Sequence, residues 1–258
     1  MAERTSLQGK VALITGAAGA IGRATAILMA DRGAAIVAVD RDGSDLTGLA
    51  AALPPDARCA PVTADVRTER DVAAYAAAAV KAFGRIDIFV NNAGVEGMVK
   101  PVEDYPLDAF RAVIDINVIG VFLGLKHVLP VMYAQGSGCI VNMSSIAGLK
   151  GTPGLSAYTA SKHAVIGITR SVAAEAGPRG VRVLSVNPGP IESRMMDSIN
   201  AGQSPDAAAA HAAVAAMVPQ QRYGRVEEVA ELVAFLSSDA AGYCHGGIYS
   251  VDGGMCAV

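Results

Sequence analysis

The chain has 258 residues, a length typical of one α/β domain with a large buried core. Apolar residues make up 52% of the sequence and charged residues only 17%, so we expect some helix faces to be buried against other subunits of a homo-oligomer. The net charge is −3, and lysine and arginine are scattered along the chain without forming a basic stripe. Binding to a phosphate backbone requires such a stripe, so we expect no nucleic acid partner.

The amino-terminal residues MAERTSLQGK lack the apolar core of a secretion signal, and no uninterrupted apolar stretch approaches the ~18 residues of a membrane-spanning helix. We therefore expect a cytoplasmic protein without a membrane partner. The histidines and cysteines show no metal-ligand spacing, which predicts no metal site. Reduced thiols are expected at four cysteines that lie far apart without a C-x-x-C pair: Cys59, Cys139, Cys244 and Cys256.

Seven short apolar segments alternate with longer, alanine-rich helical patterns. The segments are apolar along their whole length, which is typical of parallel strands covered by helices on both faces. The connections are long enough for right-handed crossover helices. The sequence therefore predicts one α/β domain, 1–258, with a three-layer, doubly wound, parallel seven-stranded sheet of the Rossmann type. Its strands are expected at residues 11–15, 34–40, 60–65, 86–92, 138–144, 181–187 and 247–252.

Capping patterns mark two of the helices. Thr68 and Asp71 resemble a capping arrangement ahead of a helix that should end at Gly84. A second helix should run from 156 to 176 and end at a Gly-Pro pair. Residues 189–220, between the sixth strand and the last long helix, are too many for an ordinary connection, so we expect one or two small helices there that act as a substrate lid.

The segment TGAAGAIG, residues 15–22, follows the first strand and opens a helix. Glycines let the backbone N–H groups and the helix N-terminus approach a pyrophosphate without obstruction by a Cβ. The spacing G-x-G-x-x-G is absent, and a glycine-rich turn with a purely structural role would look similar. The turn alone therefore does not decide the function.

Asp40 ends the second predicted strand, 18 residues after Gly22. A carboxylate at that strand tip accepts hydrogen bonds from the adenosine ribose hydroxyls and repels a 2′-phosphate, which favours NAD over NADP. Arg41 weakens this inference, because an arginine there is able to face a phosphate. A helix cap or a solvated strand end is the alternative interpretation of Asp40.

Tyr158 and Lys162 lie one helical turn apart in SAYTASKHAV, residues 156–165, and should share a helix face. A free tyrosine has a pKa of ~10, too high for proton exchange near neutral pH. A nearby ammonium lowers that pKa by ~1–3 units, and an oxidised nicotinamide ring would add positive charge. The pair thus predicts acid–base chemistry beside a dinucleotide; a surface contact is the alternative.

With these motifs together, the sequence resembles the short-chain dehydrogenase/reductase family over essentially the whole chain. Ala20 occupies a position that is more often glycine, which leaves cofactor binding in place. The motifs that carry the resemblance occur in the family's order and spacing: TGAAGAIG at 15–22, NNAG at 91–94, Ser145 thirteen residues before Tyr158, YTASK at 158–162, NPGPI at 187–191 and VDGG at 251–254.

The resemblance implies four catalytic residues. Tyr158 would donate a proton to the carbonyl oxygen during reduction or remove it from the alcohol during oxidation. Lys162 would lower the pKa of that tyrosine and hydrogen-bond the nicotinamide ribose. Ser145 would orient the substrate oxygen, with Ser144 as the competing serine, and Asn117 would hold a water that links the lysine to solvent.

The resemblance also implies the binding residues. Asp65 and Val66 match a pair that contacts adenine, and Ile191 matches a contact to the carboxamide. The substrate pocket should include Ser145 and Tyr158, with Glu96 and Met195 nearby. The full cofactor set is Gly16, Ala20, Ile21, Gly22, Asp40, Asp65, Val66, Asn92, Ala93, Gly94, Tyr158, Lys162, Pro188, Gly189 and Ile191.

These expectations predict an NAD(H)-dependent oxidoreductase that transfers a hydride between nicotinamide and a small, apolar or cyclic secondary alcohol or its ketone. A 3-oxoacyl thioester (acyl-carrier-protein) reductase is the alternative, since the tail VDGGMCAV resembles those enzymes too. A non-catalytic dinucleotide-binding protein is a third possibility. Alanine-rich helices around 107–135 and 156–176, which the family pairs between subunits, predict a homotetramer.

Overall fold

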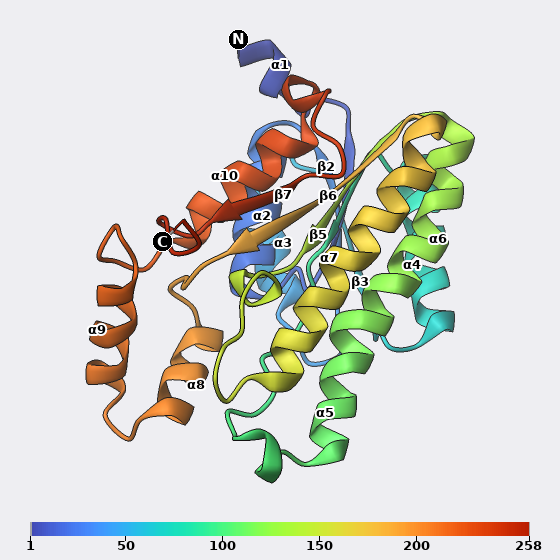
Figure 1. Cartoon of the computed structure of the whole chain (residues 1–258). Coiled ribbons are helices and arrows are strands. Elements are labelled where there is room, and N and C mark those ends of the chain that lie inside the picture. Colours follow the sequence, from blue (N-terminus) through green and yellow to red (C-terminus); the bar gives the residue numbers. More distant parts are fainter. Residues whose placement is uncertain (1, 258) are drawn as a thin grey trace.

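The computed structural model describes residues 2–257 of the chain. Its strands form one parallel sheet in the order β3-β2-β1-β4-β5-β6-β7, with helices over both faces (Figure 1). All seven predicted strands are confirmed to within two residues at each end. They are β1 Val11–Thr15, β2 Ala35–Asp40, β3 Cys59–Thr63, β4 Ile88–Asn91, β5 Gly138–Met143, β6 Val181–Pro188 and β7 Ile248–Val251.

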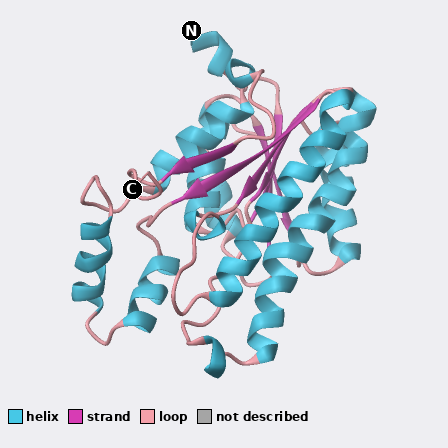
Figure 2. Cartoon of the chain, in the orientation of Figure 1, coloured by secondary structure: helices cyan, strands magenta, loops and turns pink. Residues whose placement is uncertain are grey.

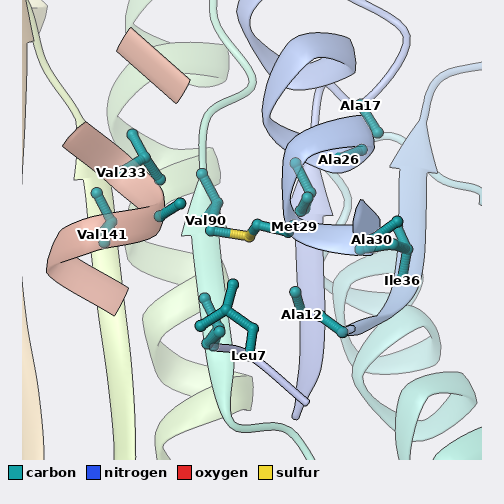
Figure 3. Packing of buried hydrophobic residues seen from close by; sticks show 14 of the residues in the cluster. Leu7, Ala12, Ala17, Ala26, Met29, Ala30, Ile36, Val90, Val141 and Val233 are labelled. Atoms are coloured by element: carbon teal, nitrogen blue, oxygen red, sulfur yellow. The ribbon is translucent and has the colours of Figure 1, made fainter. Parts of the chain in front are cut away.

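Two apolar cores hold the layers together, because successive strand residues point to opposite faces of the sheet. Ala12 and Ile14 of β1 belong to the first core, which α2 (Ala20–Asp31), α3 (Leu46–Ala52) and α10 (Val226–Ser237) cover. Figure 3 shows Met29 of α2 within that core. Val11 and Leu13 belong to the second core, under α4 (Glu69–Phe83), α6 (Gly120–Gln135) and α7 (Ser156–Ala176). The predicted three-layer, doubly wound fold is confirmed.

The strand order changes direction between β1 and β4, the neighbours at the centre of the sheet. In an open α/β sheet the crevice at such a point, beyond the carboxyl ends of the strands, is where ligands bind. The glycine-rich turn follows β1 and the NNAG segment spans the end of β4. The topology therefore brings both segments to one place.

The predicted helix ends are largely confirmed. Gly84 ends α4 in the left-handed conformation, and α7 has the expected limits. Thr68 is the N-cap of α4, but its hydroxyl makes no capping bond, so that part of the prediction was wrong. The carboxylate of Asp71 accepts instead from the N–H of Asp65 at 3.3 Å.

A continuous helical segment, Leu107–Gln135, comprises α5 (Leu107–Ile114), the π-helical η2 (Asp115–Ile119) and α6. By length and composition alone, this segment is apolar enough to cross a membrane. Half of its most apolar window is buried inside the fold. It packs as the core helix of a globular domain does.

Two helices stand apart from the layers: α8 (Arg194–Gln203) and α9 (Ala207–Met217) (Figures 1 and 2). They lie beyond the carboxyl end of β6, within the segment 189–220 where small helices were predicted. The remaining helices are short: α1 Ala2–Thr5, η1 Val102–Asp104, η3 Ile146–Gly148, η4 Gly177–Arg179 and η5 Asp239–Ala241.

Candidate active site

The turn between β1 and α2 is built so closely that only glycine fits at two positions. Gly16 has a φ of +64°, and a Cβ there would lie 2.9 Å from Ala93 Cα. A Cβ on Gly22 would lie 2.1 Å from the carbonyl oxygen of Gly16. The N-cap of α2 is Gly19, which has no side chain to cap the helix. The first N–H groups of the helix are therefore left for a ligand. This cradle fits the pyrophosphate of a dinucleotide.

The NNAG segment fastens that turn to the sheet. Asn92 Nδ2 donates to the carbonyl oxygens of Thr15 at 2.9 Å and Gly16 at 3.2 Å. The hydroxyl of Thr15, fully buried, accepts from the N–H groups of Asn92 and Ala93. Asn91 Nδ2 donates to Val121 O and so ties β4 to α6. The turn is therefore held in shape before any ligand binds.

Asp40 faces the same turn from the tip of β2. Its Oδ2 accepts from Ala18 N–H at 2.9 Å, and its Oδ1 accepts from Arg41 N–H and the Ser44 hydroxyl, both at 2.8 Å. A carboxylate has about four acceptor positions, so one remains for a ribose hydroxyl. Ser44 was missed in the sequence because no motif marks it.

The expected adenine contacts lie after β3. The carboxylate of Asp65 is engaged by Arg67, whose Nη2 lies 2.6 Å from Oδ2 and holds the pKa of Asp65 below its usual range. Val66 packs so closely on α6 that a Cβ on Gly120 would lie 2.9 Å from its Cγ2. The contact of Asp65 and Val66 with an adenine ring stays a prediction.

The catalytic pair lies on one buried face of α7. Lys162 Nζ is 5.4 Å from the centroid of the Tyr158 ring and donates to Met143 O at 2.9 Å. Ser145 follows β5, and its Oγ accepts from Ala147 N–H. Ser144 Oγ instead donates to Lys162 O at 3.0 Å. Ser144 thus supports the α7 backbone, whereas Ser145 interacts with the phenol.

Burial dominates the titration of this pair. It raises the pKa of Tyr158 to about 12; the Ser145 hydroxyl acts in the opposite direction and the Glu96 carboxylate adds to the rise. Burial also lowers the pKa of Lys162 to about 8. Desolvation of the phenolate is the largest cause of the rise in Tyr158, and the lowering of that pKa by Lys162 stays a prediction.

Asn117 is fully buried in the π-helical turn η2, a kind of insertion that is frequent at functional sites. Its Oδ1 accepts from Val95 N–H at 2.9 Å, and its Nδ2 donates to Val95 O and to Ser161 Oγ. A Cβ on Gly94 would lie 3.2 Å from that Oδ1 and 3.4 Å from Lys162 Nζ. The amide thus fixes the loop after β4 against α7; its water-holding role stays a prediction.

A cavity of about 970 Å³ opens over these groups. Five methionines contribute to its wall, which gives it an apolar character: Met143, Met195, Met196, Met217 and Met255. Met255, in the tail after β7, was missed because nothing in the sequence relates the tail to the pocket. The predicted residues on the wall are Ile21, Asn92, Gly94, Ser145, Tyr158, Lys162, Pro188, Gly189, Ile191 and Met195.

Other predicted residues lie outside this cavity. Gly16, Ala20, Gly22, Asp40, Asp65, Val66 and Ala93 lie at or after the tips of β1 to β4, where an adenosine would extend. Asn117 and Glu96 are not on the wall either. Glu96 is 8% exposed, acts on Tyr158 through its charge, and has Arg194 Nη1 at 4.0 Å. Contact of Glu96 with the substrate stays a prediction. Among residues 2–257, no cluster of three His, Cys, Asp or Glu side chains suits a metal.

A tyrosine–lysine pair beside a dinucleotide cradle on a doubly wound sheet defines a nicotinamide-dependent oxidoreductase. The sequence matches the family described as enoyl-(acyl carrier protein) reductase over residues 16–256, and the chain belongs to the short-chain dehydrogenase/reductase family. Levodione reductase of Leifsonia aquatica is 41% identical over 257 residues, 98% of this chain and 96% of that protein. Cis-4-hydroxycyclohexanecarboxylate dehydrogenase of Sinomonas cyclohexanicum is 43% identical, with 96% and 97% covered.

A 3-oxoacyl-[acyl-carrier-protein] reductase of Thermotoga maritima is 38% identical over 254 residues, which cover 96% of this chain and 98% of that protein. Among solved structures, levodione reductase superposes with a TM-score of 0.95 at 40% identity, with 97% of this chain and 99% of that chain covered. NAD⁺-bound xylitol dehydrogenase gives 0.92 at 36% identity, with 96% and 99% covered. A structure from Beutenbergia cavernae with bound NADP gives 0.89 at 33% identity, with 99% and 100% covered.

These matches span almost the whole chain and agree with the catalytic geometry. The protein is an oxidoreductase that acts on CH–OH groups and transfers a hydride between a nicotinamide cofactor and a secondary alcohol or its ketone.

Proposed function

We propose that the protein interconverts a cyclic secondary alcohol and its ketone with NAD(H). The observation that carries this proposal is the position of Tyr158, Lys162 and Ser145 at an apolar cavity of about 970 Å³. A cavity of this size with an apolar lining accommodates a ring. The names of two relatives, levodione reductase and cis-4-hydroxycyclohexanecarboxylate dehydrogenase, support a cyclic substrate.

The mechanism assigns one task to each side chain. A nicotinamide held at the cradle would supply the hydride in reduction and accept it in oxidation. Tyr158 gives its proton to the carbonyl oxygen in reduction and takes a proton from the alcohol in oxidation. Ser145 donates a hydrogen bond to the same oxygen and stabilises the charge that develops there. Lys162 contributes positive charge beside the phenol, and Asn117 holds the loop that packs against it.

Replacement of the tyrosine hydroxyl tests this assignment. Tyr158→Phe removes the proton donor, so kcat for cyclohexanone reduction should fall by about 10³-fold, while the Kd for NADH changes less than threefold. Tyr243→Phe, at a fully exposed tyrosine, is the matched control. NADH absorbance measures turnover, and quenching of NADH fluorescence measures binding. Full activity in Tyr158→Phe would refute the role.

We also propose NAD as the preferred cofactor. Asp40 is fixed at the cradle by three hydrogen bonds, and its charge opposes a 2′-phosphate. Arg41 is exposed beside it, and related structures hold either cofactor. Wild-type kcat/KM should be at least about tenfold higher with NADH than with NADPH, and Asp40→Ser should reduce that ratio. A strong preference for NADPH overturns this proposal.

The second candidate function is reduction of a 3-oxoacyl thioester, favoured by the relative from Thermotoga maritima. The two functions are distinguished by measuring kcat/KM for acetoacetyl-CoA and for cyclohexanone, each with NADH and with NADPH at the same cofactor concentration. A higher kcat/KM for cyclohexanone with NADH supports the cyclic alcohol; a higher value for the thioester with NADPH supports the alternative.

The proposed assembly is a homotetramer in the cytoplasm. Exposed apolar side chains on the 107–135 segment support an interface: Leu107 is 60%, Phe122 50% and Ile119 42% exposed. The four cysteines are all free thiols, as in a reducing compartment. A monomer by light scattering would contradict the assembly. We further propose that α8 and α9 serve as a lid over the substrate.

A further inference from the structure

The two ends of the proposed lid meet in one short hinge. Ile191 pairs with Gly224 in an isolated parallel bridge, and Glu192 N–H donates to Gly224 O at 2.9 Å. Gly224 N–H in turn donates to Pro190 O at 2.9 Å. Residues 193–223, which carry α8 and α9, therefore form a closed excursion from the body of the protein. Whatever joins the helices to this hinge determines where the lid lies.

Apolar packing holds α9 only weakly. Of its eleven residues, only Ala210 and Val214 are buried. An alanine and a valine remove little apolar surface from water, and the stabilisation from burial is roughly proportional to that area. A segment with few buried contacts opens more easily than the core. The position of α9 must therefore depend on its other contacts.

Those contacts converge on Tyr223, at the hinge end of the lid. The ring of His211, from α9, stacks on the Tyr223 ring with centroids 4.0 Å apart and planes 6° apart. His211 Nε2 also lies 3.2 Å from Glu192 Oε1 on the opposite side of the hinge. The His211 ring thus connects α9 to both ends of the excursion, to Tyr223 at one end and to Glu192 at the other.

The phenol group of Tyr223 connects to α8. Asn200 Nδ2 donates to Tyr223 Oη at 3.1 Å, and Tyr223 Oη donates to Asn200 Oδ1 at 3.3 Å. Both residues are almost fully buried. Loss of one partner leaves the other unpaired away from water, which is unfavourable. Ile199, the residue before Asn200 on α8, joins Met195 and Met196 on the cavity wall.

We propose that Tyr223 is a positioning residue for the substrate: it fixes α8 through Asn200 and α9 through His211, and so holds the methionine wall against the ring of the substrate. This inference rests on the proposed function. It assigns substrate affinity, not hydride transfer, to a residue that does not line the cavity.

Tyr223→Phe keeps the stacked ring and removes the bond to Asn200. The KM for cyclohexanone should rise about tenfold, while kcat and the Kd for NADH change less than twofold and the melting temperature changes only slightly. Tyr243→Phe, outside the lid, is the matched control and should leave all four quantities unchanged. A KM in Tyr223→Phe equal to that of the wild type overturns the inference.

A double-mutant cycle tests the pairing itself. If Asn200 acts through Tyr223, Asn200→Leu and the double variant should each raise KM to about the value in Tyr223→Phe, without multiplication of the two effects. Multiplicative effects would show that the residues act independently. His211→Phe, which keeps the stacking, should affect KM less than His211→Ala; the reverse order contradicts the role of the ring.

Limited trypsin digestion separates this inference from the proposed function, because it needs no turnover. Arg194 and Arg222 lie at the two ends of the lid, and cleavage after them should be about tenfold faster in Tyr223→Phe than in the wild type or Tyr243→Phe. Equal cleavage rates overturn the positioning role even in an active enzyme. A wild type without turnover, but with faster cleavage in Tyr223→Phe, refutes only the proposed function.

Discussion

The cofactor cradle and the lid lie at the same edge of the sheet but are held by different means. In the cradle, Thr15, Gly16 and Asn92 share hydrogen bonds between β1 and β4, and Gly22 leaves no space for a Cβ. In the lid, α9 buries only two side chains and depends on one stacked ring. The chain thus combines a rigid binding site for the cofactor with a loosely attached wall for the substrate.

This contrast has a physical origin in the distance from the sheet. The cradle continues the two central strands, whose residues are buried on both faces by neighbouring strands and helices. The lid leaves the layers after β6, and each of its two helices buries only two residues: Ile199 and Asn200 in α8, Ala210 and Val214 in α9. A substitution in the cradle should therefore affect folding and cofactor binding, and one in the lid should affect substrate affinity.

The largest effect is expected at Gly22. Its Cβ would lie 2.1 Å from Gly16 O, a backbone atom that cannot move without the turn, so Gly22→Ala should destabilise the fold by about 3 kcal/mol. NADH binding should weaken more than tenfold. Thermal unfolding and fluorescence titration measure both. Gly167→Ala, inside α7 with open space around the new Cβ, is the control and should bind NADH normally. Normal NADH binding in Gly22→Ala would show that the cradle is less rigid than described.

An intermediate effect is expected at Gly202 in the last turn of α8. A Cβ there would lie 2.7 Å from Val99 Cγ2, in the loop after β4, so Gly202→Ala should push the lid away from the body. KM for the ketone should rise about fivefold with an unchanged Kd for NADH. Val99→Gly in the same chain removes both the Cγ2 and the Cβ, which would lie 2.8 Å from the new methyl carbon, so it makes room for the methyl group and should reverse most of the rise. A loss of NADH binding instead would remove the distinction between the two regions.

The smallest effect is expected at Glu96, between the two regions. Its negative charge raises the pKa of Tyr158, so the neutral amide in Glu96→Gln should lower that pKa. The tyrosine acts as a base in alcohol oxidation, and its active form appears as the pH rises. The alkaline rise in kcat/KM should therefore move to lower pH by a fraction of a unit. Glu175→Gln, on an exposed part of α7, is the control; a shift to higher pH contradicts the assignment.

Most of the fold and the cofactor half of the site could be predicted because their signals are local. Seven apolar runs correspond to seven strands, and the four-residue spacing of Tyr158 and Lys162 fixes their shared helix face whatever lies around them. The pair of Asn200 and Tyr223 gives no such signal. Their separation of 23 residues follows no helical or strand period, so only the folded chain reveals the contact.

Burial also separates what was predictable from what was not. The sequence placed a cation beside the catalytic phenol, and from that pair alone a lowered pKa follows. In the folded chain, β5, α7 and the loops around them exclude water from Tyr158, and its pKa rises to about 12. The sequence by itself determined which groups meet at the carboxyl edge of the sheet, because short spacings and apolar runs specify local structure. The tertiary structure alone decided how those groups titrate and how the lid is fastened, because desolvation and long-range contacts are contributed by segments far apart in the chain.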